Sequence, residues 1–170
     1  EAWLCYLFGQ SQAAVELFRE VEAYAVYGSG HYFVPLSYLY DALAHAALAD
    51  LQASDEHSQI LERINRNLKE LDMWVRFAPM NHQHKQDLIE GEKARLEGRY
   101  WDALTLYQKA IQGARENGFL YEEALAYEVC GQFWLSQNDK EMAQFYLQRA
   151  QNLYGLWGAE AKVKHLQMQY

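Results

Sequence analysis

The chain contains 170 residues, of which 51% are hydrophobic and 22% are charged, and its formal net charge is −8. This length and composition provide the core of one domain and exclude an intrinsically disordered chain, which lacks apolar residues. Valine, isoleucine and threonine together occupy only twelve positions, although strands are usually rich in these residues. The composition therefore predicts an all-α fold.

Apolar residues recur at helical spacing along almost the whole chain, with short breaks that contain glycine, asparagine or proline. Short connections of this kind place consecutive helices antiparallel to one another. The pattern predicts helices over 1–8, 11–27, 32–53, 55–77, 80–97, 100–116, 119–137 and 140–154, with a last helix within 157–170.

Local signals set the ends of several of these helices. Ser11 and Asp55 can each accept a hydrogen bond from the first turn of the helix that follows. Pro79 suits the start of a helix, because the N–H that it lacks has no partner there. The Asn-Gly pair at 117–118 predicts a left-handed helix end, and another break is expected at 154–155.

The second half of the sequence contains an internal repeat. The segment from Gly98 to Ala110 aligns with the segment from Asn138 to Ala150, and Gly91 aligns with Gly131 in the preceding helices. Small residues at such places let two helices approach closely. We expect a single domain over 1–170 with repeats at about 1–30, 31–78, 79–117 and 118–156, followed by a helix at 157–170.

Residues 88–111 resemble the tetratricopeptide repeat. Its small and aromatic positions are matched by Gly91, Ala103, Tyr107 and Ala110. The chain departs from the family in two ways: its repeat is longer than the family's, which has about 34 residues, and Arg115 stands in place of the terminal proline. The resemblance implies a right-handed superhelix of antiparallel helix pairs, built from longer helices.

A second resemblance covers about residues 80–166, including the segments 91–94, 98–104 and 154–163. These segments are similar to the helical region of large bacterial multidomain signalling kinases. In that family a serine/threonine-kinase domain and a STAND-type NTPase precede the helical region, and sensor domains and a histidine kinase usually follow it. The resemblance implies that the chain is a fragment of such a protein and couples its neighbouring domains.

The tetratricopeptide resemblance also implies which residues face a groove, because the first helix of each repeat lines the concave side of such arrays. The residues placed there are Lys85, Leu88, Glu92, Arg95, Leu125, Glu128, Gln132 and Leu135. The acidic Glu92 and Glu128 interrupt the basic pattern that would grip a terminal carboxylate. A peptide partner bound in another way is one interpretation of this face, and a solvated polar surface without a ligand is the other.

The histidines do not predict a metal centre. Asp41 and His45 lie one helical turn apart, and so do His84 and Asp87, but two ligands from one helix need partners elsewhere. Kinase signatures and a phosphate-binding glycine loop are both missing from the sequence. We predict no metal, no cofactor and no enzymatic activity for this chain.

The aromatic residues allow two interpretations. They make up 15% of the chain, and one stretch holds Tyr24, Tyr27, Tyr32, Phe33, Tyr38 and Tyr40. Aromatic side chains with a polar tip are favoured at interfaces and grooves. In a helical array they also serve in the core and between repeats. The cluster is thus a candidate for partner contact, with core packing as the alternative.

Charge and cysteine usage limit the partners and the location. Residues 1–56 carry eight acidic residues and one base, Arg19, so we expect neither nucleic acid nor a membrane as a partner. Cys5 and Cys130 are far apart in apolar context, which indicates reduced thiols and a cytoplasmic location. Exposed repeat ends, such as the helix that begins the chain, predict a homodimer.

These observations lead to one expected function and one alternative. We expect a non-catalytic protein-interaction or interdomain-coupling scaffold within a cytoplasmic signal-transduction protein, with the flanking domains of the same chain as its first partners. The alternative is a helical-repeat regulator that binds a peptide or a small molecule in its concave groove.

Overall fold

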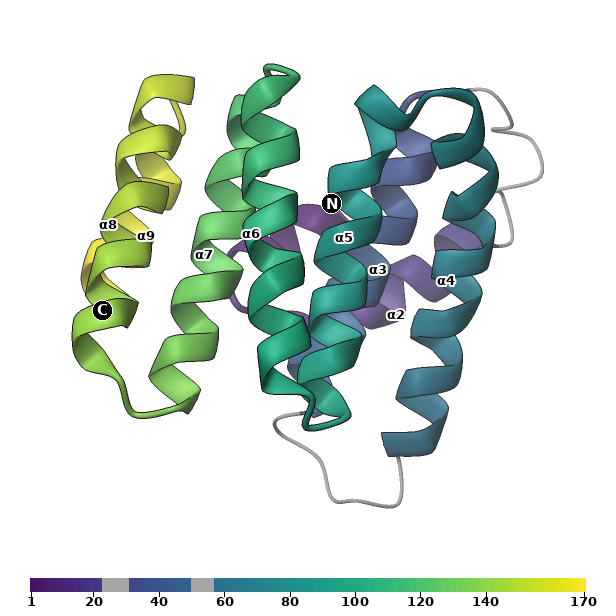
Figure 1. The fold of residues 1–170 in the computed structure, drawn as a ribbon, viewed down its shortest axis with the longest axis horizontal. Coiled ribbons are helices and arrows are strands. Elements are labelled where there is room, and N and C mark those ends of the chain that lie inside the picture. Colours follow the sequence, from purple (N-terminus) through teal and green to yellow (C-terminus); the bar gives the residue numbers. More distant parts are fainter. Residues whose placement is uncertain (23–30, 50–56) are drawn as a thin grey trace.

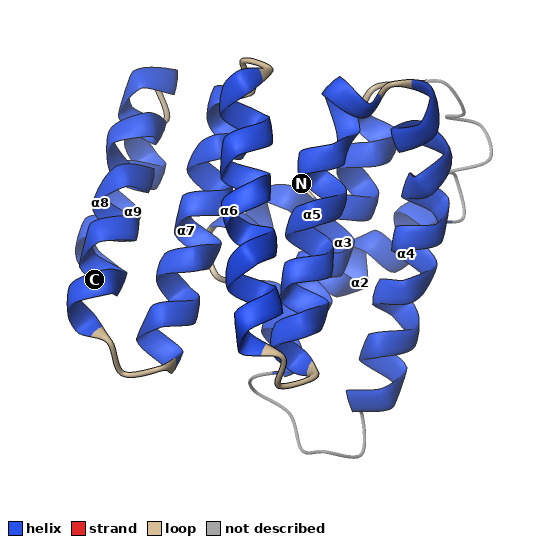
Figure 2. Ribbon diagram, viewed as in Figure 1, coloured by secondary structure: helices blue, strands red, loops and turns tan. Residues whose placement is uncertain are grey.

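The computed structural model describes residues 1–22, 31–49 and 57–170, and every regular element in these ranges is a helix (Figures 1 and 2). The helices are α1 (Ala2–Leu7), α2 (Ser11–Glu22), α3 (Phe33–Ala49), α4 (His57–Phe77), α5 (Pro79–Leu96), α6 (Tyr100–Glu116), α7 (Leu120–Ser136), α8 (Lys140–Trp157) and α9 (Glu160–Gln169). The all-α prediction is confirmed for these ranges. The predicted cap Asp55, the aromatic residues Tyr24 and Tyr27, and the helix ends expected at 27 and 53 lie outside them.

Neighbouring helices pack in pairs. α3 lies against α4, α5 against α6, and α7 against α8, while α3 also packs on α5 (Figure 1). In Figure 1, α2 and α3 lie behind α4 and α5, and α1 lies behind α6 and α7. Among the described helices, α3, α5 and α7 have the most buried residues, so they form the middle of the molecule.

The connections between the later helices share one geometry. Each contains a left-handed residue, and these residues recur at a constant spacing: Gly98 (φ 74°), Gly118 (φ 77°), Asn138 (φ 61°) and Gly158 (φ 89°). The next N–H then bonds back into the preceding helix, as from Arg99 to the carbonyl of Ala94 at 2.8 Å. This arrangement satisfies carbonyls that the helix end leaves free. Because these turns are evenly spaced, α6, α7 and α8 have nearly equal lengths.

Helix ends agree with the local signals at two places and differ at two others. Pro79 begins α5, and the pair at 117–118 ends α6, as predicted. Ser11 is the first residue of α2 and not a cap before it. The break expected at 154–155 is wrong, because α8 continues to Trp157 and ends at the left-handed Gly158. An interior glycine costs a helix only about 1 kcal/mol, so Gly155 does not stop it.

Two glycines allow the close approach of paired helices. A Cβ atom on Gly91 would lie 2.7 Å from the ring of Tyr107, and a Cβ atom on Gly131 would lie 2.7 Å from Cγ of Leu147. Both contacts join the first helix of a pair to the second, and the internal repeat of the sequence relates one contact to the other. In both pairs, α5–α6 and α7–α8, a glycine of the first helix thus packs against a large side chain of the second.

Candidate ligand-binding site

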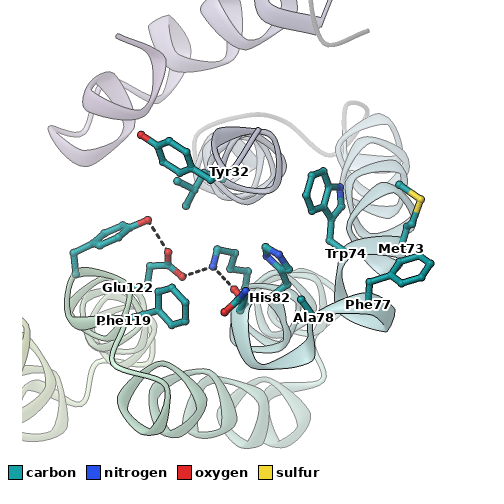
Figure 3. A pocket seen from close by; sticks show the side chains of 12 residues that line it. Tyr32, Met73, Trp74, Phe77, Ala78, His82, Phe119 and Glu122 are labelled. Atoms are coloured by element: carbon teal, nitrogen blue, oxygen red, sulfur yellow. Dashed lines mark hydrogen bonds and ion pairs between the residues drawn. The ribbon is translucent and has the colours of Figure 1, made fainter. Parts of the chain in front are cut away.

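A cavity of about 810 Å³ opens among α3, α4, α5 and α7 (Figure 3). Its volume lies within the range of roughly 300–1,000 Å³ that is typical of ligand sites. Its wall is mainly apolar and is contributed by the last turns of α4, the beginning of α3 and the beginning of α7. The residues of this wall are Tyr32, Leu36, Met73, Trp74, Phe77, Phe119 and Tyr121.

The end of α4 presents unusually exposed apolar side chains to this cavity. The buried stripe of α4 runs through Ile64, Leu71 and Val75. Phe77 lies off this stripe, and its side chain is 86% exposed. Because Pro79 already begins α5, the chain turns away directly after Phe77. The cavity wall therefore extends outward as an apolar rim.

Beside the apolar wall, the cavity contains a buried cluster of charged and ring groups on α5 and α7. Nζ of Lys85 lies 2.8 Å from Oε2 of Glu122, and Nε2 of His84 contacts the same oxygen. The other oxygen of Glu122 accepts the hydroxyl of Tyr121 at 2.6 Å. Three polar groups thus hold the carboxylate in one position.

Lys85 is held by three further contacts besides its ion pair. Its Nζ donates to the carbonyl of Asn81 at 2.5 Å and lies 3.2 Å from Nε2 of His84. The ammonium also lies 4.6 Å from the ring centroid of Phe119, which is a cation–π distance. The cation is consequently fixed at the edge of the cavity.

Burial and pairing act in opposite directions on this ion pair. Burial lowers the pKa of Lys85, and the nearby Glu122 carboxylate only partly opposes this effect. Burial alone would raise the pKa of Glu122, but the hydrogen bond from His84 and the charge of Lys85 outweigh it and hold that pKa below its usual value. Glu122 is therefore a carboxylate at neutral pH.

His82 supplies a neutral polar group to the wall. Burial, together with the charges of Lys85 and His84, lowers its pKa to about 4. Its ring stands edge-on to Trp74 with centroids 5.6 Å apart. Its buried Nδ1 has no hydrogen-bond partner among the residues that the structure describes. A ligand group that reached this atom would gain a hydrogen bond that none of the described residues supplies.

The eight residues predicted to face a groove lie together on α5 and α7, but most of them are not on an open surface. Lys85, Leu88, Glu92, Leu125 and Glu128 are buried, Arg95 and Leu135 are partly buried, and Gln132 is exposed. Only Lys85 lines the cavity. Most of these side chains are therefore not open to solvent, and contacts from α3 and α9, which are distant in sequence, reach this face.

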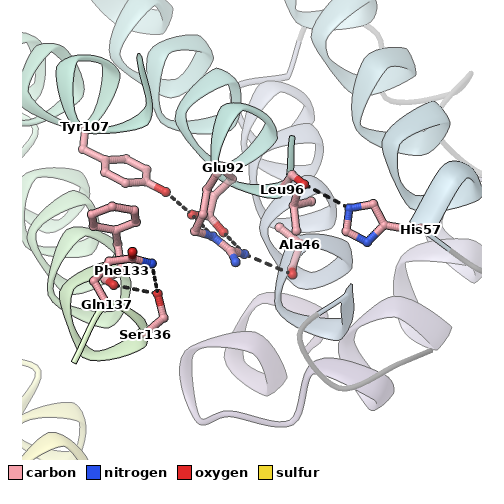
Figure 4. Close-up of polar contacts among 9 residues, drawn as sticks. Ala46, His57, Glu92, Leu96, Tyr107, Phe133, Ser136 and Gln137 are labelled. Carbon is pink, nitrogen blue, oxygen red and sulfur yellow. Dashed lines mark hydrogen bonds and ion pairs between the residues drawn. The ribbon is translucent and has the colours of Figure 1, made fainter. Parts of the chain in front are cut away.

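Glu92 is the centre of one buried network on this face (Figure 4). Its carboxylate accepts the hydroxyl of Tyr107 at 2.5 Å and two hydrogen bonds from Arg95 at 3.0 and 2.9 Å. Arg95 also donates to the carbonyl of Ala46 at 3.3 Å and so ties α5 to α3. Glu92 thus serves the packing of three helices.

Glu128 forms an equivalent network one helix pair further on. It accepts hydrogen bonds from Lys162 at 2.7 Å and from the hydroxyl of Tyr154 at 2.9 Å. These partners come from α9 and α8, so the carboxylate joins three helices. Both acidic residues that the sequence placed in a groove are therefore neutralised by neighbours from their own fold.

Sequence patterns did not identify most of the cavity. Met73, Trp74, Phe77, His82 and Glu122 were not predicted as site residues. One signal was available in α4, where Met73 and Phe77 fall outside the buried helical stripe. Of the aromatic cluster, Tyr32 is exposed and lines the cavity, whereas Tyr40 is buried in the core.

The part of the chain that the structure describes holds no group of three histidine, cysteine, aspartate or glutamate side chains placed to bind a metal. Within the same ranges, no helix has both the length and the apolar character required to cross a membrane. No protein-family model matches the sequence, and no curated protein or solved structure shows significant similarity to it.

Proposed function

We propose that the chain is a non-catalytic interaction module that binds an apolar polypeptide segment in the cavity among α3, α4, α5 and α7. The observation that carries this proposal is the apolar rim of the cavity. Phe77 and Tyr32 are 86% and 80% exposed there, and Met73 is more than half exposed. Contiguous apolar surface of this kind marks interaction sites in soluble proteins.

The extent of the rim favours a polypeptide over a small molecule. A compact ligand that filled the cavity would leave Phe77 and Tyr32 largely in water. An extended or helical segment can insert one side chain into the cavity and cover the rim with its neighbours. Such anchoring by aromatic residues in a pocket is the usual energetic centre of protein interfaces.

A small-molecule regulator is the second candidate, and one observation favours it. The cavity combines an apolar wall with a few polar groups, namely the Lys85–Glu122 pair and Nδ1 of His82, which has no partner within the described ranges. Small-molecule sites commonly have this composition.

In the wider protein, we propose the tetratricopeptide-like superhelix as the architecture and interdomain coupling in the cytoplasm as the role. The equivalent Gly91 and Gly131 contacts support the repeat interpretation. The resemblance to multidomain signalling kinases supports flanking domains of the same chain as the source of the bound segment.

Exposed Leu156 on α8 and Met168 on α9 support a homodimer through the repeat ends, which sedimentation velocity would test.

Site-specific photo-crosslinking tests the proposed site. A benzophenone amino acid replaces Phe77 in one variant and Trp101 in the other, since both positions are more than 80% exposed and only Phe77 lines the cavity. The chain is expressed with its natural neighbours in cells, irradiated and analysed by mass spectrometry. We expect a polypeptide adduct at position 77 and none at position 101.

The other outcomes are equally informative. An adduct of small-molecule mass at position 77 would favour the second candidate. Equal crosslinking at both positions, or none at position 77, would contradict a binding role for the cavity.

A further inference from the structure

A second cavity, of about 400 Å³, opens among α2, α3 and α4. In Figure 1, α2 and α3 lie behind α4. The wall of this second cavity is mainly polar, in contrast to that of the first cavity, and the two walls share none of the residues that the structure describes. The inference below is therefore independent of the proposed function.

Three arginines meet at the second cavity. Arg19 comes from the last turn of α2, whereas Arg63 and Arg66 lie three residues apart on one face of α4. The chain contains only eight arginines and has a net charge of −8, so a generally basic sequence does not explain this grouping. Glu62 is the one acidic side chain among the described residues of the wall. The wall therefore holds an excess of positive charge.

A buried carboxylate fixes one of these arginines. Nε of Arg63 donates to Oδ2 of Asp41 at 2.7 Å, and the side-chain amide of Asn67 donates to the same oxygen at 2.6 Å. Asp41 is buried on α3, and the side chain of Arg63 is only 16% exposed. The guanidinium is thus oriented before a ligand arrives, which lowers the entropic cost of binding. Because Asp41 also offsets the charge of Arg63, the excess at the wall comes from Arg19 and Arg66.

His45 contributes a ring nitrogen to the same wall. Its Nδ1 lies 2.8 Å from the backbone carbonyl oxygen of Asp41. Since a carbonyl oxygen only accepts hydrogen bonds, Nδ1 carries a proton and Nε2 is the ring nitrogen that can meet a ligand. Nε2 accepts a hydrogen bond from a hydroxyl group when the ring is neutral, and it donates one to an anion when the ring is charged.

The rest of the wall includes an apolar part. Val15 of α2, Leu48 of α3 and Ile60 of α4 line it, and all three side chains are buried. Apolar ligand surface that leaves water against such side chains is stabilised by about 25 cal/mol per Å². A ligand that matches both parts of the wall therefore combines an anionic group with a small organic body.

We propose that this second cavity binds a small organic phosphate. Its phosphate group lies among the three arginines, and its organic body lies on the apolar part of the wall. A guanidinium presents a planar fork of N–H donors that fits two phosphate oxygens, and a phosphate monoester carries about two negative charges at neutral pH. The cavity volume lies near the lower end of the range of roughly 300–1,000 Å³ for small-molecule sites, which favours a small ligand.

Isothermal titration calorimetry of the unmodified chain tests this proposal, with phenyl phosphate as the probe. This compound carries a phosphate monoester on a small apolar ring. Inorganic phosphate and phenol each keep one of these two parts and serve as the matched ligands. We expect phenyl phosphate to bind at one site per chain, at least about tenfold more tightly than either matched ligand.

Two arginine variants locate the binding. Arg19→Gln removes an arginine of the cavity wall and should weaken the binding of phenyl phosphate by about tenfold, because a charge-assisted hydrogen bond is lost. Arg76→Gln removes the same charge from the last turn of α4, where the side chain is exposed and does not line the cavity. This control should change the affinity by less than about twofold.

The proposal fails if the unmodified chain does not bind phenyl phosphate, whatever the variants do. It fails equally if Arg19→Gln and Arg76→Gln weaken binding alike, because the attraction would then be one of general charge. Equal affinity for inorganic phosphate and phenyl phosphate would contradict an organic ligand. Equal affinity for phenol and phenyl phosphate would contradict the role given to the arginines.

Discussion

Three buried glutamates on α5 and α7 are each the centre of a network of hydrogen bonds and ion pairs. Glu92, Glu122 and Glu128 are all buried, and each is held by at least two polar partners. Buried charges are tolerated only when paired and hydrogen-bonded. Removal of one partner is therefore measurable even where the remaining contacts keep the fold intact.

The substitution Tyr107→Phe tests how much stability is lost when the buried carboxylate of Glu92 loses one polar partner. The substitution keeps the ring that packs against Gly91 and removes one hydrogen bond to a charged group. We expect the free energy of unfolding to fall by about 2 kcal/mol in urea denaturation. Tyr100→Phe, at a half-exposed position of the same helix, is the control and should change stability by less than about 0.5 kcal/mol. Equal effects would contradict the role given to the Glu92 network.

His82 should give the protein a pH dependence. Its pKa is about 4 in the fold against an ordinary value of 6.5, so the unfolded chain binds more protons between these values. Stability is therefore lost as the pH falls from 6.5 to 4. The loss should be on the order of 1–2 kcal/mol, since the ring is only partly buried and solvent screens the effect.

The measurement is urea denaturation at a series of pH values. His82→Phe should flatten the stability curve in this window. His165→Phe, which leaves His82 in place, should keep the curve of the unmodified chain. An unchanged slope in His82→Phe would show that other groups cause the dependence.

At the scale of the helices, the close packing of each pair depends on a glycine in its first member. The Gly131 and Leu147 contact joins α7 to α8 in the way that Gly91 and Tyr107 join α5 to α6. Protein interiors are packed as densely as organic crystals, so an added methyl group there must displace a neighbour. The same glycine-to-alanine change is harmless where the helix surface is open.

Gly131→Ala should destabilise the protein by about 1–3 kcal/mol, because the new Cβ atom would lie 2.7 Å from Leu147. Gly155→Ala is the matched change, since its Cβ would meet only Val163 at an ordinary 4.0 Å. It should stabilise α8 by about 0.5–1 kcal/mol through higher helix propensity. Thermal unfolding would compare the two variants, and effects of the same sign would contradict this account.

At the scale of the whole molecule, stability should vary along the chain. Helix α7 packs between α6 and α8, and most of its residues are buried. Helix α1 has six residues, and the residue before it makes no side-chain cap. Arrays of helices in which each packs mainly on its neighbours open locally, with the least supported elements opening first.

Native-state hydrogen exchange would reveal this gradient. The amide hydrogens of α7 should exchange through global unfolding and be among the slowest. Those of α1 should exchange with a free energy at least about 2 kcal/mol lower, because only local contacts must break. Equal protection of α1 and α7 would show that α1 is an integral part of the core.

The sequence by itself determined the all-α fold and most of the helix ends. Left-handed glycines and Asn138, together with the proline that begins α5, act through their own backbone, and apolar periodicity needs only neighbouring residues. The internal repeat likewise predicted the Gly91 and Gly131 contacts, which are local to each helix pair.

Only the tertiary structure decided which polar side chains of α5 and α7 are buried and where the cavity lies. Glu92 and Glu128 are buried beside partners from distant parts of the chain, since Arg95 next to Glu92 binds the carbonyl of Ala46 on α3 and Lys162 of α9 binds Glu128. The cavity arises where the end of α4 and the start of α7 meet, although two helices separate them along the chain. These contacts between distant segments produce no local sequence pattern, because they depend on how successive helix pairs stack in space.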